Sequence, residues 1–184
     1  FDHFIFLKNS DGTITVSDYD NSSSNVSIPE TILDKTVSGI DSFAFSKNTT
    51  ITSVTMPNTV TKVGDSAFAD ATNLLSAKLS ENCTDVGICL FQGCTSLKSV
   101  DLNSKITLIN AQMFYKCSSI ESIVIPDTVN KIGNYAFSEC SSLKSVYIPS
   151  SVTEISRSAF RKTASVTIKG SYGSYAEEYA KANN

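Results

Sequence analysis

The chain has 184 residues, of which 41% are hydrophobic and 18% are charged, and its formal net charge is −3. This composition excludes a disordered chain, and apolar runs of only a few residues exclude a transmembrane helix or the hydrophobic region of a signal peptide. A slightly acidic chain without a cluster of Lys or Arg is also not expected to bind nucleic acid or to insert into a membrane.

Residues 1–25 are expected to form an N-terminal β cap. Two short alternating apolar runs, 4–7 and 13–16, flank Asn9-Ser10-Asp11-Gly12, and Asp-Gly between such runs is typical of a hairpin. The chain begins with Phe1 rather than Met, so we expect a trimmed or processed chain from which any targeting segment has been removed.

Residues 26–170 are expected to be repeats, because one Phe column recurs at an unbroken step of 23 residues. Such a period is typical of a solenoid, in which each module buries its apolar face only against its neighbours. We therefore predict an α/β solenoid of about six to seven coils with a parallel β-sheet along one face. The column contains Phe45, Phe68, Phe91, Phe114, Phe137 and Phe160.

The first module is predicted to diverge from the others. Sixteen positions separate Pro29 from Phe45, whereas 11 separate Pro126 from Phe137, so the first module has five extra residues around 33–36. A divergent module is typical of the end of a repeat array.

Each full module is expected to contain a strand, a turn, a second short extended piece and a short helical or 3₁₀ return. Along 145–148, Val146 and Ile148 share one face and Ser145 and Tyr147 share the other. Pro closes the strand in three modules, and Gly follows the second apolar pair, where a tight turn is expected. The stacked Phe residues are predicted to be a buried ladder rather than a ligand slot, because they have no polar handle. The glycines are Gly64, Gly87 and Gly133.

Five cysteines cannot all pair, so a complete disulfide framework is excluded. Cys94, Cys117 and Cys140 each lie three residues after a column Phe, and Cys83 occupies a column of branched aliphatic residues. Free thiols that pack as small apolar groups are one interpretation. A disulfide between stacked coils is the other, because neighbouring strands lie within bridging range.

Residues 171–184 are expected to form a C-terminal cap, with a short helix at 174–182. Ser174-Tyr175-Ala176-Glu177 fits a capping box with Ser174 as N-cap, and Tyr179 falls on the same side as Tyr175.

The repeat pattern resembles the BspA-type leucine-rich repeat family. Residues 143–155 read Leu-x-x-Val-x-Ile-Pro-x-x-Val-x-x-Ile, and Ala136, Phe137 and Cys140 precede them. The resemblance covers nearly the whole chain, and it implies a leucine-rich repeat solenoid on a secreted or cell-surface protein that meets host, matrix or cell-surface proteins. The commoner leucine-rich repeat has an interior Asn or Cys after the strand. Here that place holds Thr59, Asn82, Lys105, Thr128 and Ser151.

The outward face of the predicted sheet is the candidate binding surface. Its middle column is a file of serines, Ser53, Ser76, Ser99, Ser122 and Ser145. One interpretation is that Ser fits an exposed strand and that the flanking charges alternate in sign for stability. The functional interpretation is that this face contacts a protein partner or a glycan. The residues predicted to bind are Lys78, Lys98, Asp101, Glu121, Lys144 and Tyr147.

No catalytic, metal or cofactor site is predicted. The one histidine, His3, lies in the N-terminal cap, so a Ser-His or Cys-His pair would need a partner beside that hairpin. No phosphate-binding loop, dinucleotide motif or His and Cys pattern at metal-ligand spacing is present.

We therefore expect a monomeric, extracellular or cell-surface module that recognises a protein through its sheet face. An inert structural spacer within a larger surface protein is the second hypothesis. A glycan-binding module is the third, and the absence of Trp counts against it.

Overall fold

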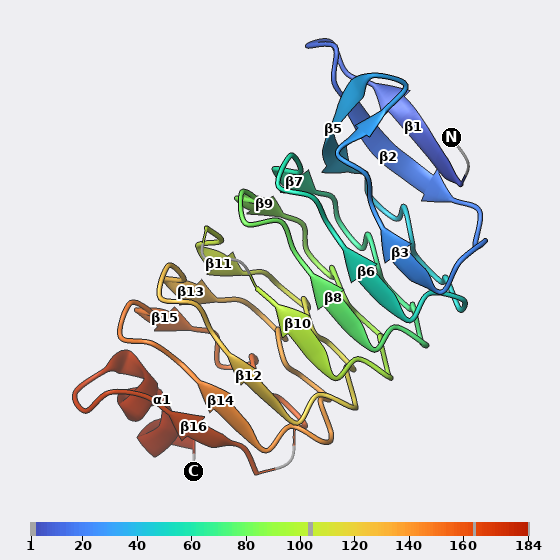
Figure 1. Cartoon of the computed structure of the whole chain (residues 1–184). Helices are drawn as coiled ribbons and strands as arrows, with labels where there is room; N and C mark the ends of the chain where they lie inside the picture. Colours follow the sequence, from blue (N-terminus) through green and yellow to red (C-terminus); the bar gives the residue numbers. More distant parts are fainter. Residues whose placement is uncertain (1–2, 103–104, 164, 184) are drawn as a thin grey trace.

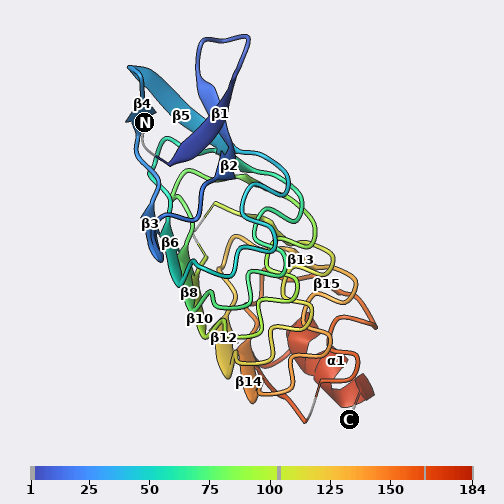
Figure 2. The same cartoon turned by 90° about the vertical axis from the view of Figure 1, so that its right-hand side faces the viewer.

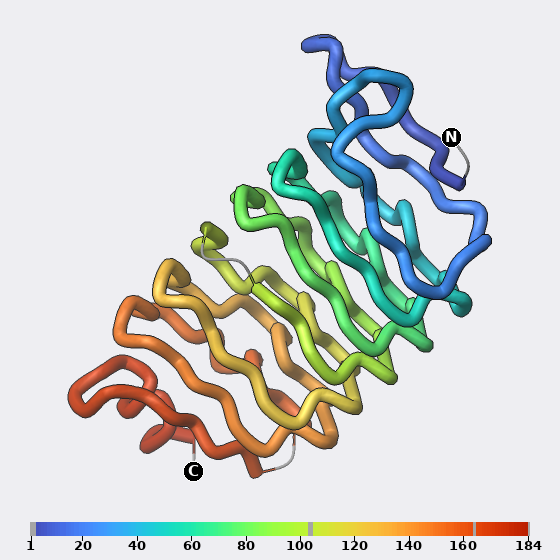
Figure 3. Tube along the Cα trace, viewed as in Figure 1, coloured from blue at the N-terminus to red at the C-terminus, as the bar shows by residue number. Residues whose placement is uncertain are grey.

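The computed structural model describes residues 3–102, 105–163 and 165–183, and it is a β-solenoid of about seven turns. Figure 1 shows the N-terminal hairpin at one end of the stack and the helix α1 (Tyr175–Asn183) at the other. Successive turns lie in step along the whole trace (Figure 3). The predicted solenoid with parallel sheets is therefore confirmed.

The predicted N-terminal hairpin is present. β1 (Phe4–Lys8) pairs antiparallel with β2 (Ile14–Tyr19). Gly12 adopts a φ of +86° in the turn, a conformation that glycine reaches without a steric cost. β2 then pairs in parallel with β5 (Lys35–Ile40), which joins the hairpin to the first turn of the solenoid.

The extra residues of the first module form a second hairpin. β4 (Thr31–Ile32) pairs antiparallel with β5, and the turn consists of Leu33 and Asp34, with φ angles of +50° and +58°. Positive φ at both central residues matches the twist of a two-residue hairpin. The sequence locates the insertion but contains no Asn-Gly or Asp-Gly there to identify the turn.

One side of the solenoid is a ladder of three-residue strands, seen edge-on in Figure 2. The strands are β3 (Asn25–Ser27), β6 (Ser53–Thr55), β8 (Ser76–Lys78), β10 (Ser99–Asp101), β12 (Ser122–Val124), β14 (Ser145–Tyr147) and β16 (Thr167–Lys169). The central residue of a strand points inward and its first and third residues point outward, as the alternation predicts; the central residue is buried in five strands and half-buried in β10 and β16.

The predicted second extended piece of each module is a strand of two residues. These strands form the second ladder, which continues from β5. They are β7 (Lys62–Val63), β9 (Asp85–Val86), β11 (Leu108–Ile109), β13 (Lys131–Ile132) and β15 (Glu154–Ile155).

The third side consists of hydrogen-bonded turns, so the predicted helical return is wrong. Among the described residues, the second residue after the column Phe has a positive φ in all six modules. The second residue before the column Phe has a positive φ in five of them. A left-handed residue interrupts a helix, and each turn except the last instead donates backbone hydrogen bonds to the next coil, as Phe68 N does to Leu90 O at 3.0 Å.

The predicted reason for Gly64, Gly87 and Gly133 is also wrong, because none of them has a positive φ. A Cβ on Gly64 or Gly87 would lie 2.4 Å from a backbone nitrogen of the preceding coil, and one on Gly133 would lie 2.9 Å from Ala111 N. Glycine is therefore needed here for the close approach of two backbones rather than for a tight turn.

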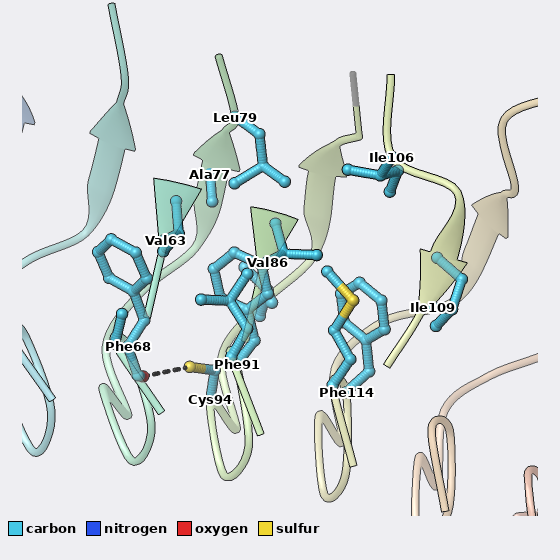
Figure 4. Packing of buried hydrophobic residues seen from close by; sticks show 14 of the residues in the cluster. Val63, Phe68, Ala77, Leu79, Val86, Phe91, Cys94, Ile106, Ile109 and Phe114 are labelled. Atoms are coloured by element: carbon cyan, nitrogen blue, oxygen red, sulfur yellow. Dashed lines mark hydrogen bonds between the residues drawn. The ribbon is translucent and has the colours of Figure 1, made fainter. Parts of the chain in front are cut away.

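The phenylalanine column forms the predicted interior ladder. Neighbouring rings are stacked with centroids 4.9 to 5.8 Å apart and interplanar angles of 7° to 22°. Figure 4 shows Phe68, Phe91 and Phe114 at equal heights in successive coils. Tyr19 covers the ladder at the N-terminal end and Tyr179 covers it at the C-terminal end, so the column continues into both caps.

All five cysteines are free, which favours the first of the two interpretations. Each stacked thiol donates a hydrogen bond to the carbonyl oxygen of the Phe that lies 26 residues earlier. The Sγ to O distances are 3.1, 3.1 and 3.0 Å for Cys94, Cys117 and Cys140 (Figure 4 shows the first). The hydroxyl of Thr163, the equivalent residue in the last module, donates a hydrogen bond to Phe137 O in the same way, with an Oγ1 to O distance of 2.6 Å. The cysteines are therefore small buried donors that join neighbouring coils.

Burial should make these thiols unreactive. It raises the pKa of Cys94 and Cys140 to about 12 and that of Cys83 to about 11, and it raises the pKa of Cys117 as well. At pH 8, a disulfide reagent should modify the half-buried Cys89 alone, and the other four thiols should react only after denaturation.

The same pKa shifts predict a loss of stability at alkaline pH. The folded pKa of a buried thiol lies above its ordinary value of 9.0, so its contribution to stability is complete below about pH 9 and declines as the pH rises toward 12. Urea midpoints measured from pH 7 to pH 11 should be constant at first and then fall. Rapid native modification of several thiols, or a midpoint independent of pH, would contradict the buried placement.

The C-terminal helix α1 is confirmed, one residue later than predicted at each end, but the capping box is wrong. Glu177 accepts a hydrogen bond from the amide of Gly173 at 2.6 Å, and the buried hydroxyl of Ser174 has no hydrogen-bond partner among the described residues. Gly173 turns the chain with a φ of +74° immediately before the helix, which brings its own amide within reach of Glu177. Ala176 and Tyr179 are the helix residues that pack against the last coil.

Candidate functional site

The outward face of the first ladder carries the residues predicted to bind. Lys78, Asp101 and Tyr147 are the third residues of β8, β10 and β14, and their side chains are exposed. Lys98, Glu121 and Lys144 each immediately precede a strand and are exposed as well. The structure therefore places all six on one face, although binding by them remains a prediction.

Four of these six side chains form ion pairs between neighbouring coils. Lys78 Nζ lies 3.9 Å from Asp101 Oδ2, and Lys144 Nζ lies 2.7 Å from Glu121 Oε2. The hydrogen bond and charge of Lys144, with a smaller contribution from Lys98, lower the pKa of Glu121. Because ion pairs between exposed side chains contribute little to stability, they favour alignment of the coils more than overall stability.

The first ladder is interrupted between β10 and β12. Strands pair from β3 to β10 and again from β12 to β16, but among the described residues β10 and β12 do not pair. The amides of Lys98 and Lys144 donate to the preceding coil at 2.9 and 2.8 Å, whereas the equivalent amide of Glu121 has no partner in the described part of the chain. The facing edges of β10 and β12 therefore keep unpaired backbone groups.

The second ladder opens at the same level. Within residues 3–102, 105–163 and 165–183, β9 and β11 do not pair, and the side chain of Asn110 bonds to the carbonyl of Val86 in place of a backbone donor. On the third side the coils stay joined, since Cys89 N and Phe91 N donate to the next coil at 2.9 Å. The opening is therefore confined to the two strand sides of one step in the stack.

A groove of about 610 Å³ lies at this interruption. Its apolar part includes Val100, half-buried on β10, and Val124, which is 69% exposed on β12. Its charged part consists of Lys98, Asp101 and Asp127. An apolar hollow with a few charged groups and open backbone edges has the character of a recognition site.

The groove includes two of the predicted residues, Lys98 and Asp101. The other four are not among its lining residues: Lys78, Lys144 and Tyr147 belong to the neighbouring coils, and Glu121 immediately precedes β12, which forms one wall of the groove. Sequence reasoning missed Val124 as a binding residue, although a β-branched apolar residue in an exposed column was a usable signal. The groove itself was not predicted, because the interruption leaves no mark in the strand pattern.

No histidine or cysteine is among the described residues that line the groove. His3 pairs with Asp20 at 2.9 Å in the N-terminal hairpin. Across the described residues there is no cluster of three or more His, Cys, Asp or Glu side chains that could hold a metal ion. No helix in that part of the chain is long and apolar enough to cross a membrane.

Comparisons with known proteins agree with the repeat architecture. The model of the BspA type leucine-rich repeat region matches in six copies, over residues 18–120 and 62–176. No curated protein matches the chain.

Several solved bacterial structures are similar. A leucine-rich repeat protein of T. pallidum superposes with a TM-score of 0.77 at 23% identity, over 91% of this chain and 83% of that one. A leucine-rich cell surface protein of Faecalibacterium prausnitzii gives a TM-score of 0.80 at 29% identity, over 93% of this chain and 50% of that one. A leucine-rich repeat protein of Bacteroides capillosus gives 0.52 at 28% identity, over 80% of this chain and 94% of that one. The present chain thus spans half of the Faecalibacterium protein.

Proposed function

Because this chain belongs to the BspA type leucine-rich repeat family, we propose that it is a non-catalytic recognition module that binds a protein partner through the groove between β10 and β12. Repeat proteins of this kind present extended surfaces suited to protein binding. We also propose that the chain acts as a monomer at a cell surface or outside the cell. The name of the similar Faecalibacterium protein, a cell surface protein, supports that location.

The single observation that carries this proposal is the interruption of the first ladder. Unpaired backbone groups on β10 and β12 face the groove, and an extended segment can bond to such edges as an added strand. Val100 and Val124 offer apolar contact to its side chains, and Asp101 and Asp127 offer carboxylates. The partner that fits is a protein segment in extended conformation with an apolar residue next to a basic one.

The substitution Val124→Lys tests the proposal. The added charge would occupy the apolar part of the groove and repel a basic partner segment, while its position beside Asp101 in the column leaves the fold intact. Binding to a panel of purified matrix and cell-surface proteins should identify a partner of the unaltered chain. For that partner we expect Val124→Lys to raise Kd by at least about tenfold, as at an interface hot spot.

The matched control is Ile88→Lys. Ile88 is an exposed apolar residue that lies in the turn after β9 and does not line the groove. Its substitution should leave Kd unchanged. Equal effects of the two substitutions would contradict the groove as the site, and a panel with no binder would favour the structural spacer.

A further inference from the structure

A second hollow, the C-terminal cleft, lies between the last coil and α1. It has a volume of about 840 Å³ and is separate from the groove on the sheet face. Its lining combines side chains of the last turn, of β16 and of α1. Nothing in the proposed protein-binding role uses this cleft.

Both arginines of the chain, Arg157 and Arg161, line the C-terminal cleft. Neither guanidinium has an ion pair or hydrogen-bond partner among the described residues. By contrast, six lysines of the described residues have carboxylate partners, including the nearby Lys162, which pairs with Glu139 at 3.4 Å. Two unpaired arginines at one cleft in an acidic chain form a local site for an anion.

No Asp or Glu is among the described residues that line the C-terminal cleft, so the positive charge there is not neutralised locally. The groove differs, because it contains two aspartates beside Lys98. Arg161 also lines a smaller hollow that contains Glu139, but that carboxylate pairs with Lys162. A guanidinium binds a carboxylate through two parallel hydrogen bonds, which is stronger and more directional than a lysine contact.

The rest of the lining suits a sugar ring. Phe160, the last ring of the ladder, is partly buried and Tyr179 is 8% exposed, so these residues line the cleft only with the parts of their rings that packing leaves open. The hydroxyls of Ser165 and Thr167 line the cleft without a hydrogen-bond partner in the described part of the chain. Thr163 is different, because its hydroxyl already donates to Phe137 O. Aromatic surface beside free hydroxyls matches a molecule with an apolar face and hydroxyl groups.

We propose that the C-terminal cleft binds a carboxylate-bearing saccharide, with Arg157 and Arg161 on the carboxylate, Phe160 and Tyr179 against the ring, and Ser165 and Thr167 on its hydroxyls. The inference goes beyond the proposed function, since it concerns a different ligand class at a different end of the solenoid.

A nuclear magnetic resonance titration tests the inference with two acidic probes, trigalacturonate and sialyllactose. Their neutral counterparts are the methyl ester of trigalacturonate and lactose. The chain has only two arginine side chains, so the Nε–H signals of Arg157 and Arg161 report on the cleft directly. At least one acidic probe should shift both signals in a saturable manner, and its neutral counterpart should bind at least about tenfold more weakly because the charge-assisted hydrogen bonds are lost.

Arg157→Gln and Arg161→Gln should each lower the affinity for the acidic probe by at least about tenfold. The matched control Lys162→Gln removes a cation near the cleft that does not line it, and it should leave the affinity unchanged. Equal binding of acidic and neutral probes, no binding of either acidic probe, or an equal loss in Lys162→Gln would overturn the inference. Val124→Lys should not affect this titration. A negative result for saccharide binding at the C-terminal cleft is therefore distinguishable from a negative result for protein binding at the groove.

Discussion

Replacing Phe114 with Ala should lower the free energy of unfolding by about 3 to 5 kcal/mol, the usual cost of deleting an aromatic ring from a packed core. The ring of Phe114 is fully buried, and it stacks on Phe91 at 5.8 Å and on Phe137 at 5.3 Å. A cavity at this position would remove contacts with both neighbouring coils, and neither coil can collapse into the space without leaving register.

Urea denaturation followed by circular dichroism measures this effect. Tyr172→Ala is the control, because Tyr172 is 96% exposed and its removal should change the free energy of unfolding by no more than about 0.5 kcal/mol. Phe114→Leu keeps most of the apolar volume, so its loss in the free energy of unfolding should lie between those of Phe114→Ala and Tyr172→Ala. A midpoint for Phe114→Ala equal to that of the unaltered chain would show that the ring is not part of the core.

Ending the chain at Gly170 should cause the protein to aggregate. The truncation removes α1 and uncovers Phe160, on whose ring Tyr179 packs at a centroid distance of 6.0 Å, together with Val166 and Ile168. It also leaves β16 as an uncovered strand edge beside this apolar surface. An exposed edge next to an apolar surface is a template for association between chains.

Light scattering at increasing protein concentration measures the aggregation. A milder test compares two substitutions within the same helix, Tyr179→Ala and Tyr175→Ala. Tyr179 is buried and Tyr175 is partly exposed, so the first should lower the unfolding midpoint clearly and the second only slightly. A truncated chain that stays monomeric at high concentration would contradict the capping role of α1.

The interior of the fold could be predicted from the sequence because stacking places like residues on like residues. A column such as Phe68, Phe91 and Phe114 meets the same surroundings in every coil, so a fixed period in sequence becomes a ladder in space. The cysteine column follows the same logic. Its hydrogen bonds to carbonyls, however, depend on backbone positions that residue types alone do not define.

The turns and the glycine columns could not be predicted in the same way. Ser66 and Asp70 adopt left-handed conformations without any glycine to announce them, because the hydrogen bonds between coils hold each turn in place. Gly64 and Gly87 are fixed by contact with the preceding backbone, which is a property of the stack and not of the local sequence.

The candidate site was predicted only in part. The outward columns identified the face on which the groove lies, because alternation along a strand decides which side chains point away from the core. The groove itself arises where two ladders stop pairing at one step of the stack. That interruption depends on how two whole coils sit against each other, and the repeat pattern around Val100 and Val124 gives no sign of it.

Hydrogen exchange at the amide of Glu121 tests the proposed binding surface most directly. In the free protein this amide should exchange much faster than the equivalent amides of Lys98 and Lys144, which donate to the preceding coil. Once the partner found on the protein panel is bound, exchange at Glu121 should slow by at least about tenfold as the open strand edge becomes paired. Exchange at Glu121 as slow as that of its equivalents in the free protein, or unchanged on binding, would contradict the account.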